Sequence, residues 1–485
     1  MVTLRILVDG KKNKVVYAEA GKDFVDVLLS FLTLPLGTIA RIVSNDSDME
    51  KVSVGCLTSM YQSVANLHVK HFWKDICKEM LVHPRNSSED YCQSIKLNID
   101  DTEKTKYFIC EDWECSRKES GGLLSLFKNK RCKCGKLMNR EILPRNSSNC
   151  VGFVKDKFTF IIFDDLKVIP DNVHSSVTQP KNFGIEKLKA IKVVTVNVTQ
   201  KEIVDLLKIS LLSNTPLTDF FLRRKVFRVN LLMQRKTMVF NNVIAEPRDR
   251  GGFISLKVVR KKSNNKILFV QAGDDFIDIL LSFLTFPLGG VENMLKGNSC
   301  LGSIDNLYNS ILDLDSNKYL KSSNIKDKLV KSCVAQHFKL QEQILPIDEV
   351  PIVKYSCYTE QNNIGGICNS YLTTTQGYQY TCGNRVYVPL TYVEPLSSTC
   401  KSGFVKKPSL FMVTDDLVVR PGSSMSVVSF LTTLGFSSSE FDEQIIKIGK
   451  RECLSLLKAS LFSSSALTDV LGQFIFPIKK EKITM

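Results

Sequence analysis

The sequence predicts an α+β protein built from two tandem homologous domains, and three observations support this fold class. The phrase FLTLPLG at 31–37 returns as FLTFPLG at 283–289, an offset of 252 residues. Further blocks of the first half recur in the second half in the same order. Within these blocks, short β-prone runs alternate with helical patterns, which indicates mixed structure. The constant order and nearly constant offset indicate duplication of one long unit.

The recurring blocks set the boundaries of the predicted domains. The first copy covers 1–240, a linker rich in Asn, Pro and Gly covers 241–252, and the second copy covers 253–485. A unit of about 230 residues is long for a single domain, so each copy can contain subdomains. The first-half blocks are LRILVDGKKNKVVYAEAGKDFVDVLLSFLTLPLG, MYQSVANL, FIIFDDLKVIP and DLLKISLLSNTPLTD.

The first block predicts a β-hairpin followed by a helix. LRILV and KVVYA are β-prone runs joined by a polar turn that contains Asp9, Gly10 and Asn13. Apolar residues from Phe24 to Phe31 then recur at helical spacing. The second copy repeats this pattern, so each domain is predicted to open with a ββα unit.

The phrase FLTLPLG is predicted to be the buried end of that helix. Pro35 disfavours helical geometry at Leu34, and Gly37 is expected to take the positive φ of a helix exit. A ligand-recognition loop is the alternative. Packing is favoured, because an apolar phrase with Pro and Gly is what a helix end against a sheet requires.

A second ββα unit is predicted within each copy, which would give four in the chain. SFLTTLG at 429–435 resembles SFLTFPLG at 282–289, and both follow two β-prone runs joined by a polar turn. The likeness has nearly vanished in the corresponding segment of the first half, and chance similarity of a short apolar phrase is the alternative. A common origin requires the helices to lie on the same face of the sheet.

The composition is that of a globular protein with a basic surface. The chain has 485 residues, of which 44% are hydrophobic and 24% charged, and its formal net charge is +15. Such charge attracts polyanions, but only residues 128–140 and the KKEK near the end concentrate it. A solvated basic surface is therefore favoured over dedicated nucleic-acid binding.

The sequence also bears on location. No apolar run reaches the roughly 18 to 20 residues that cross a bilayer, and the N-terminal residues alternate like a strand rather than a signal peptide. We therefore expect no membrane association and a cytoplasmic or nuclear protein. In a reducing compartment, the fifteen cysteines favour buried thiols or metal ligands over a disulfide framework.

Four cysteines of the first copy form the sharpest chemical signal. Cys110 and Cys115 in CEDWEC, and Cys132 and Cys134 in RCKCG, are two pairs separated by a loop. Such pairs can place four thiolates around a zinc ion, so 107–138 is a candidate zinc knuckle. Because four sulfur ligands leave no open coordination position, the zinc would be structural. The spacing departs from the common two-residue form, and free thiols in a basic loop remain the alternative.

The second copy lacks this pattern. Cys357 and Cys382 stand where the two pairs should be, with Cys368 between them. Three thiolates can bind a metal with an outside ligand, but loss of the site is favoured.

Other candidates for chemistry have plainer explanations. Adjacent Asp164 and Asp165 can share a catalytic site, but neighbours in a strand point to opposite faces, and DDL between β-prone runs predicts a hairpin turn. His68 and His71 are three residues apart and are predicted to be a surface pair. The sequence contains no GxSxG, GxxxxGK[ST] or HExxH motif, which disfavours the commonest hydrolase, nucleotide-binding and zinc-protease classes.

The residues that carry these patterns also carry a family resemblance. VDGKKNKVVYAEAGKDFVDVLLSFLTLPLG, YQSVANL, the cysteines around RCKCGKLMN, FDDLKV and LLKISLLSNTPLTD resemble the plant family of domains of unknown function DUF674. The resemblance covers nearly the whole chain and implies a plant protein with the unit in tandem. It supplies no catalytic residues. The second copy departs from the pattern at Lys261 and Gln271, where the first has Asp9 and Glu19.

Two classes of function remain for the sequence. The favoured one is a non-enzymatic interaction or scaffold module that binds another protein, because the identities between the copies are concentrated at apolar and turn positions. The alternative is an enzyme of unrecognised type that uses Asp165 or Cys132 in a cleft between the copies. Weak nucleic-acid binding through 128–140 is a variant of the first class.

Overall fold

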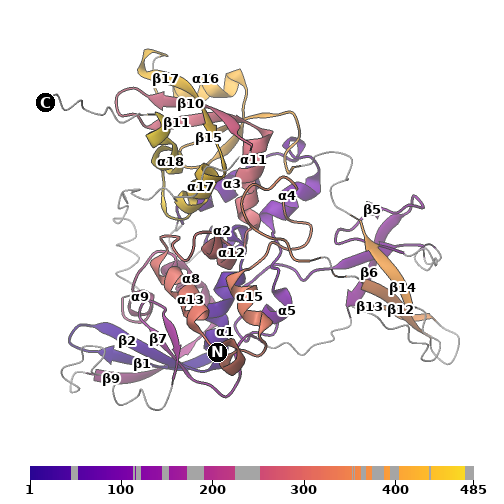
Figure 1. Ribbon diagram of the computed structural model, residues 1–485, viewed down its shortest axis with the longest axis vertical. Coiled ribbons are helices and arrows are strands. Elements are labelled where there is room, and N and C mark those ends of the chain that lie inside the picture. Colours follow the sequence, from indigo (N-terminus) through magenta and orange to yellow (C-terminus); the bar gives the residue numbers. More distant parts are fainter. Residues whose placement is uncertain are drawn as a thin grey trace. The chain divides into compact units, whose positions relative to one another are not determined.

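A computed structural model of the chain (Figure 1) describes eleven stretches together with residues 115 and 353. These stretches are 1–44, 53–112, 122–144, 152–171, 191–223, 252–351, 355–361, 367–373, 387–393, 403–435 and 438–475. The chain forms two compact units. Unit 1 comprises Met1–Asp101, Val151–Asp348 and Gly403–Met485, and unit 2 comprises Thr102–Cys150 and Glu349–Ser402. Each unit takes residues from both predicted copies, and the predicted boundaries stay a prediction.

Unit 1 contains two five-stranded sheets of the same design. The first has the order β8-β7-β2-β1-β9 and the second the order β16-β15-β11-β10-β17. Both contain a β-bulge at the matching place, between Leu7 and Val8 and between Val259 and Arg260. The strands of the first sheet are β1 (Val2–Asp9), β2 (Lys14–Ala20), β7 (Phe160–Phe163), β8 (Val168–Pro170) and β9 (Ile191–Val198). Those of the second are β10 (Ile254–Lys261), β11 (Ile267–Gly273), β15 (Leu410–Thr414), β16 (Val419–Pro421) and β17 (Phe441–Ile448).

Helices cover the sheets, so the fold class is mixed α+β with several small sheets. The first half contributes α1 (Lys22–Ser30), η1 (Phe31–Thr33), α2 (Leu36–Ser44), α3 (Leu57–Asn66), η2 (Val69–His71), α4 (Asp75–Val82), α5 (Glu89–Cys92), α8 (Gln200–Ser210) and α9 (Pro216–Phe221). The second half contributes α11 (Asp274–Ser282), η4 (Phe283–Thr285), α12 (Leu288–Met294), α13 (Gly302–Asp313), α14 (Ser316–Tyr319), α15 (Asn324–Val330), α16 (Ser424–Thr433), η5 (Ser438–Glu440), α17 (Lys450–Phe462) and α18 (Ala466–Ile475).

The phrase FLTLPLG joins two helices, which differs from the helix end that was predicted. Leu34 is extended, with φ −69° and ψ 129°, as Pro35 requires. Gly37, however, lies within the first turn of α2 and does not have the positive φ that was predicted. Its role is steric. A Cβ atom at Gly37 would lie 2.9 Å from the carbonyl oxygen of Leu284 in the other copy of the phrase.

The two copies of the phrase bind each other, which explains why the chain contains it twice. The backbone N–H of Leu36 donates to the carbonyl oxygen of Phe286 at 2.8 Å, and that of Leu288 donates to Leu34 at 3.0 Å. These reciprocal bonds form an antiparallel bridge between Pro35 and Pro287. The bonds satisfy backbone N–H and C=O groups that would otherwise be buried without a partner. The two halves meet here about a local pseudo-twofold axis.

The segments that follow the phrase exchange between the halves. Ser310 of α13 accepts from the backbone N–H of Val168 in the first sheet at 2.9 Å. Ser63 of α3 accepts in the same way from Val419 in the second sheet at 3.1 Å. Each half therefore supplies helices to the sheet of the other, so the halves of unit 1 are intertwined.

In each half of unit 1, a buried aspartate holds a loop by the same pair of hydrogen bonds. Asp278 accepts from the backbone N–H groups of Phe404 at 2.7 Å and Val405 at 3.0 Å, and Asp26 makes the same pair of bonds to Phe153 and Val154. Each loop begins with a glycine, because a Cβ atom at Gly403 would lie 1.4 Å from Oδ2 of Asp278. The halves thus share a polar contact whose role is structural.

Asp278 makes the stability of unit 1 depend on pH. Burial raises the pKa of Asp278 to about 7, although Lys407 lies 3.8 Å away and opposes the shift together with the two N–H bonds. The folded state therefore binds this proton more tightly than the unfolded state, and the stabilisation that it gives is lost as pH rises from about 4 to about 7. Asp278→Asn is expected to remove this part of the slope of unfolding free energy against pH, because an amide oxygen still accepts both N–H bonds.

Denaturant unfolding between pH 4 and pH 8 measures that slope. Asp327→Asn is the control, since the Asp327 side chain is 70% exposed and pairs with Lys331 one helical turn away. Parallel curves for wild type and Asp278→Asn would contradict the assignment.

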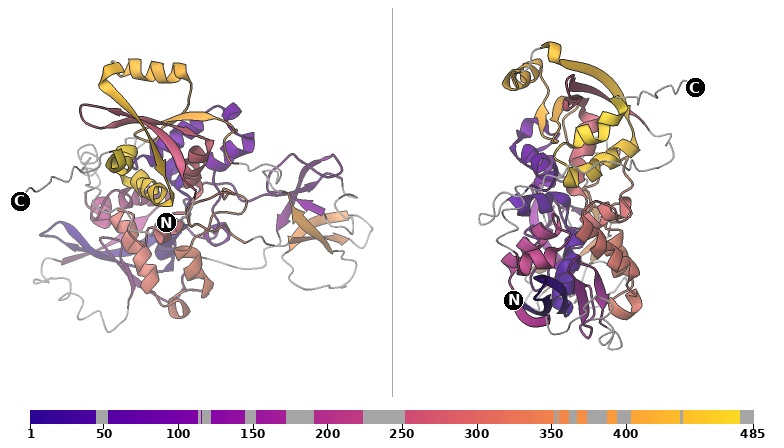
Figure 2. Two further views of the ribbon diagram at one scale, coloured as in Figure 1. Left: turned by 45° about the horizontal axis from the view of Figure 1, so that its top comes forward. Right: turned by 90° about the vertical axis from the view of Figure 1, so that its left-hand side faces the viewer.

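The prediction of a second ββα unit within each copy is wrong for the second copy. Strands β15 and β16 do precede α16, but α16 packs on the sheet face formed by Val259, Phe269 and Met412. Figure 2 shows α16 on the side of the sheet opposite α11. A shared origin required the same face, and the likeness of SFLTTLG to SFLTFPLG is therefore a similarity between apolar helices. The corresponding first-half segment lies outside the described residues.

Unit 2 is a small β-barrel to which both halves of the chain contribute. Its sheet has the order β3-β6-β13-β12-β14-β4, with β5 paired to β6. Phe108 and Ser125 exchange two backbone hydrogen bonds of 2.8 Å, which join β3 to the end of β4 and close the ring. The strands are β3 (Tyr107–Cys110), β4 (Gly122–Leu124), β5 (Lys130–Arg131), β6 (Leu137–Pro144), β12 (Tyr355–Gln361), β13 (Ile367–Thr373) and β14 (Tyr387–Tyr392).

The barrel core is shared between the halves. Ile109, Leu124 and Ile142 of the first half pack with Leu372 and Leu390 of the second. Parallel pairs of strands, β6 with β13 and β4 with β14, join the two contributions. The hydrogen-bonded hydroxyls of Tyr107 and Tyr355, 3.2 Å apart, add a polar contact between them. Neither contribution closes this barrel by itself.

Candidate metal centre

Three short segments of unit 2 carry the four cysteines. Cys110 is the last residue of β3, and Cys115 follows it by five positions. Cys132 and Cys134 lie in the turn between β5 and β6, which the backbone N–H of Gly135 closes on Cys132 O at 2.9 Å. Gly135 has φ +86°, a conformation that other residues rarely adopt, so the glycine of RCKCG shapes the turn that holds two of the thiols.

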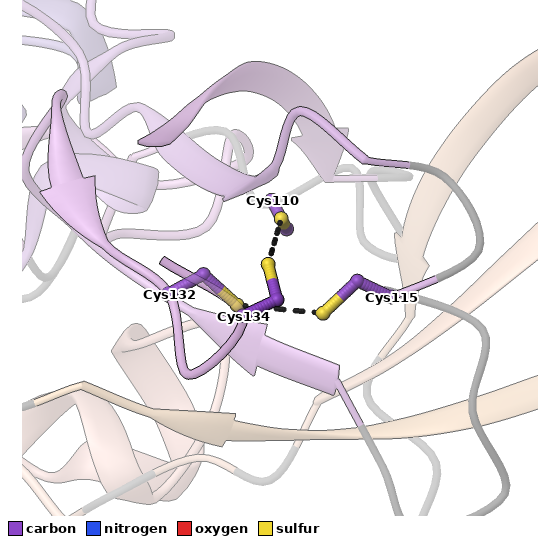
Figure 3. A group of neighbouring side chains, drawn as sticks. All are labelled: Cys110, Cys115, Cys132 and Cys134. Carbon is purple, nitrogen blue, oxygen red and sulfur yellow. Dashed lines mark hydrogen bonds between the residues drawn. The ribbon is translucent and has the colours of Figure 1, made fainter. Parts of the chain in front are cut away.

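The structure brings together all four cysteines that the sequence predicted as metal ligands (Figure 3). Their sulfur atoms lie within 4.8 Å of one another, and no ion is present. Sγ of Cys110 is 3.5 Å from that of Cys134, and Sγ of Cys115 is 3.6 Å from that of Cys132. Sulfur ligands in a tetrahedral zinc site are about 3.8 Å apart, because each Zn–S bond is about 2.3 Å long. We call these four residues the cysteine cluster.

The pKa values of the thiols differ within the cysteine cluster. Burial, reinforced by the neighbouring thiols, raises the pKa of Cys110 to about 12 and that of Cys115 to about 11. A hydrogen bond from the backbone N–H of Lys136 is the main cause that lowers the pKa of Cys134 to about 7. A cation that binds here would draw protons from Cys110 and Cys115, so its affinity should increase with pH.

Residues two positions beyond the ligands support them. The backbone N–H of Asp112 donates to the sulfur of Cys110, as that of Lys136 does to Cys134, and both bonds favour the thiolate form. The side chains of Asp112 and Lys136 form an ion pair of 2.9 Å, which ties the two ligand segments together. Sequence reasoning missed both residues; their signal is the position two residues after a ligand cysteine.

An apolar base lies under the cysteine cluster. Cys110 and Cys132 are buried against Phe108 and Met138, whereas Cys134 is exposed and Cys115 half-buried. The cluster therefore has one side toward the barrel core and one side toward solvent. Four sulfur donors in this setting suit a soft or borderline divalent cation in a closed, four-coordinate site, and such a site has no position for a substrate.

The carboxylates predicted to form a hairpin turn do so. Asp164 and Asp165 lie between β7 and β8, and Asp164 accepts from the backbone N–H and the hydroxyl of Thr218 at 2.7 and 2.8 Å. Asp415 makes the same bonds to Thr468 in the second half. Asp164 and Asp415 hold a helix against a hairpin in both halves, whereas Asp165 is half-buried and accepts a hydrogen bond from the backbone N–H of Lys167.

The remaining candidates do not form a site among the described residues. His68 is exposed and accepts from the backbone N–H of Lys70, and His71 is half-buried, so the two form a surface pair as predicted. The side chains of Cys357 and Cys368 and all of Cys382 lie outside the described residues. Of the basic segment 128–140, Lys128, Arg131, Lys133 and Lys136 are exposed around the cysteine cluster.

Fold and site together define a class of protein: a mixed α+β chain with two matching sheets and a barrel that carries four clustered thiols. The chain belongs to the family described as protein of unknown function DUF674, whose sequence model matches residues 1–451. The family resemblance read from the sequence is thereby confirmed, and the plant origin that it implies stays a prediction. No curated protein and no solved structure matches the chain. Among the described residues, no helix has the length and apolar character needed to cross a membrane.

Proposed function

We propose that the chain is a non-enzymatic scaffold that binds another protein, and that a structural zinc ion held by Cys110, Cys115, Cys132 and Cys134 stiffens its barrel. Two homologous halves, 1–240 and 253–485, build this scaffold. The zinc fixes the first half's contribution to the barrel, onto which the strands of the second half pack.

The proximity of the four sulfur atoms, all within 4.8 Å, carries this proposal. Residues that are up to 24 positions apart in the sequence converge there. Burial raises the pKa of Cys110 and Cys115, so both thiols stay protonated until a cation displaces their protons. Zinc fits the donor set because thiolate sulfur is among its preferred ligands.

The hydrogen-bond partners of the aspartates that occur at matching positions in both halves support a scaffold rather than an enzyme. Asp26 and Asp278 bind backbone N–H groups of loops, and Asp164 and Asp415 bind threonines of helices. The carboxylates common to both halves thus have structural partners. A catalytic site requires titratable groups that converge on a shared substrate position.

Metal analysis of the purified, reduced full chain tests the proposal. We expect one zinc per chain, measured by inductively coupled plasma mass spectrometry, and loss of the zinc in Cys132→Ser. Cys300→Ser is the matched control, because Cys300 is half-buried in unit 1 and far from the cluster in sequence, and it should retain the metal. A zinc-free wild-type chain from cells supplied with zinc would overturn the zinc assignment.

A further inference from the structure

We propose that the cysteine cluster is also a site of modification by peroxide, at which oxidation forms the disulfides Cys110–Cys134 and Cys115–Cys132. The proposal rests on the proposed function only for the zinc that oxidation would release. The pairing itself rests on the arrangement of the four thiols.

The distances select one pairing. Four cysteines allow three pairings, and the two sulfur–sulfur contacts with hydrogen-bond geometry, Cys110 with Cys134 at 3.5 Å and Cys115 with Cys132 at 3.6 Å, belong to the same one. A disulfide bond is about 2.05 Å long, so side-chain rotation must bring each pair closer by about 1.5 Å. Figure 3 shows both contacts within one group of side chains.

Exposure selects the order of reaction. Each close pair joins a more accessible thiol to a buried one: Cys134 is exposed and Cys110 buried, while Cys115 is half-buried and Cys132 buried. Peroxide from solvent can reach Cys134 first. The buried partner then lies in contact with the oxidised sulfur, where it can resolve it before further oxidation.

The chemistry balances with hydrogen peroxide as the only oxidant. The thiolate of Cys134 attacks one peroxide oxygen, the O–O bond breaks, and the products are a sulfenic acid and hydroxide, which is protonated to water. The thiolate of Cys110 then attacks the sulfur of Cys134, forms the S–S bond and expels a second hydroxide, also protonated to water. Each pair loses two electrons to one peroxide, and Cys115 with Cys132 repeats the sequence.

Two consequences follow for the barrel. Disulfide sulfur is no longer an anionic ligand, so the zinc leaves when the pairs form. The new bonds join the same segments that the metal joined, because Cys110 of β3 and Cys115 beyond it would each be linked to the turn between β5 and β6. The oxidised, zinc-free barrel should therefore keep its structure, unlike a reduced barrel from which the metal has been taken by a chelator.

The test treats the reduced full chain with increasing hydrogen peroxide and maps disulfides by mass spectrometry of non-reduced peptides, while a chromogenic chelator follows zinc release. We expect both disulfides to appear in step with release of the bound zinc. Any other pairing within the cluster, or preferential pairing with cysteines outside it, would overturn the proposal. The disulfide map does not require zinc, so it also tests the proposed pairing in a zinc-free chain.

A matched pair of variants separates the order of attack from simple loss of a ligand. Cys115→Ser and Cys134→Ser each remove one thiol of the cluster. Only Cys115→Ser should still form the Cys110–Cys134 disulfide at the wild-type rate, whereas Cys134→Ser should lose the rapid step altogether. Equal behaviour of the two variants would contradict Cys134 as the first site of attack.

Discussion

Removal of the metal from the reduced chain by a strong chelator is expected to unfold the first half's contribution to the barrel. Structural zinc supplies an apparent free energy of about 10 to 16 kcal/mol in small metal-dependent domains, comparable with the whole stability of a domain, about 5 to 15 kcal/mol. Strands β3 and β5 have only four and two residues. The apolar group against which the cysteines pack is small, with Phe108 and Met138 buried and Leu123 and Val393 partly buried. Amide hydrogen exchange in 107–112 and 130–144 should therefore become fast.

Unit 1 provides the internal control for this experiment. Its sheets have cores of their own, so exchange in β1 and β10 should not change when the metal is removed. The peroxide-oxidised chain provides a second control, because its disulfides should keep 130–144 protected without zinc. Unchanged protection of both barrel segments after complete metal removal would show that the barrel does not need the metal.

Replacing Gly289 by alanine is expected to destabilise unit 1 by roughly 3 kcal/mol, near the upper end for overpacked positions. A Cβ atom at this position would lie 2.2 Å from the carbonyl oxygen of Leu329 and 3.0 Å from that of Leu32. Both are backbone atoms, so no side-chain rotation relieves the contact, and Leu32 belongs to the other copy of the phrase. The substitution should thus separate the two halves where they meet.

Gly273→Ala is the matched control, because a Cβ atom there would have no neighbour within 4 Å and the backbone is extended. We expect a smaller loss for it, about 0.5 to 1 kcal/mol, because Gly273 is the N-cap of α11 and alanine is a poorer N-cap than glycine. Denaturant unfolding followed by circular dichroism measures both variants. If the two glycines proved equally tolerant of alanine, the close packing of the paired phrases would be wrong.

Local structure was predictable because it depends on neighbouring residues. The β-prone runs around Asp9 and Gly10 form the β1–β2 hairpin, and Asp164 with Asp165 forms the turn between β7 and β8. Pro35 sets the extended backbone at Leu34. In each case the decisive physics lies within a few residues: turn conformation, strand propensity or the steric effect of proline.

Features that depend on the other half of the chain were not predictable in this way. Gly37 is needed because Leu284 approaches it, and that contact spans 247 positions of the sequence. The face on which α16 packs depends on Val259, Phe269 and Met412, which lie on strands that the local pattern of α16 does not specify. Repetition shows which segments are alike, but it does not show that they exchange partners.

The sequence predicted the four ligands of the candidate site but not the residues that support those ligands. Cysteine spacing identified Cys110, Cys115, Cys132 and Cys134, and the structure brings their sulfur atoms together. The contributions of Asp112 and Lys136 come from backbone N–H groups and one ion pair, which only the folded turn defines. The other half of the barrel had no sequence signal that linked it to the site.

X-ray absorption at the zinc edge of the reduced full chain tests the central claim most directly. The account predicts a first shell of four sulfur atoms at about 2.3 Å with no oxygen or nitrogen. That result would establish a closed, structural site at the cysteine cluster. A shell with fewer sulfur atoms and a light-atom ligand near 2.0 Å would mean an open coordination position, and it would contradict the structural role assigned to the metal.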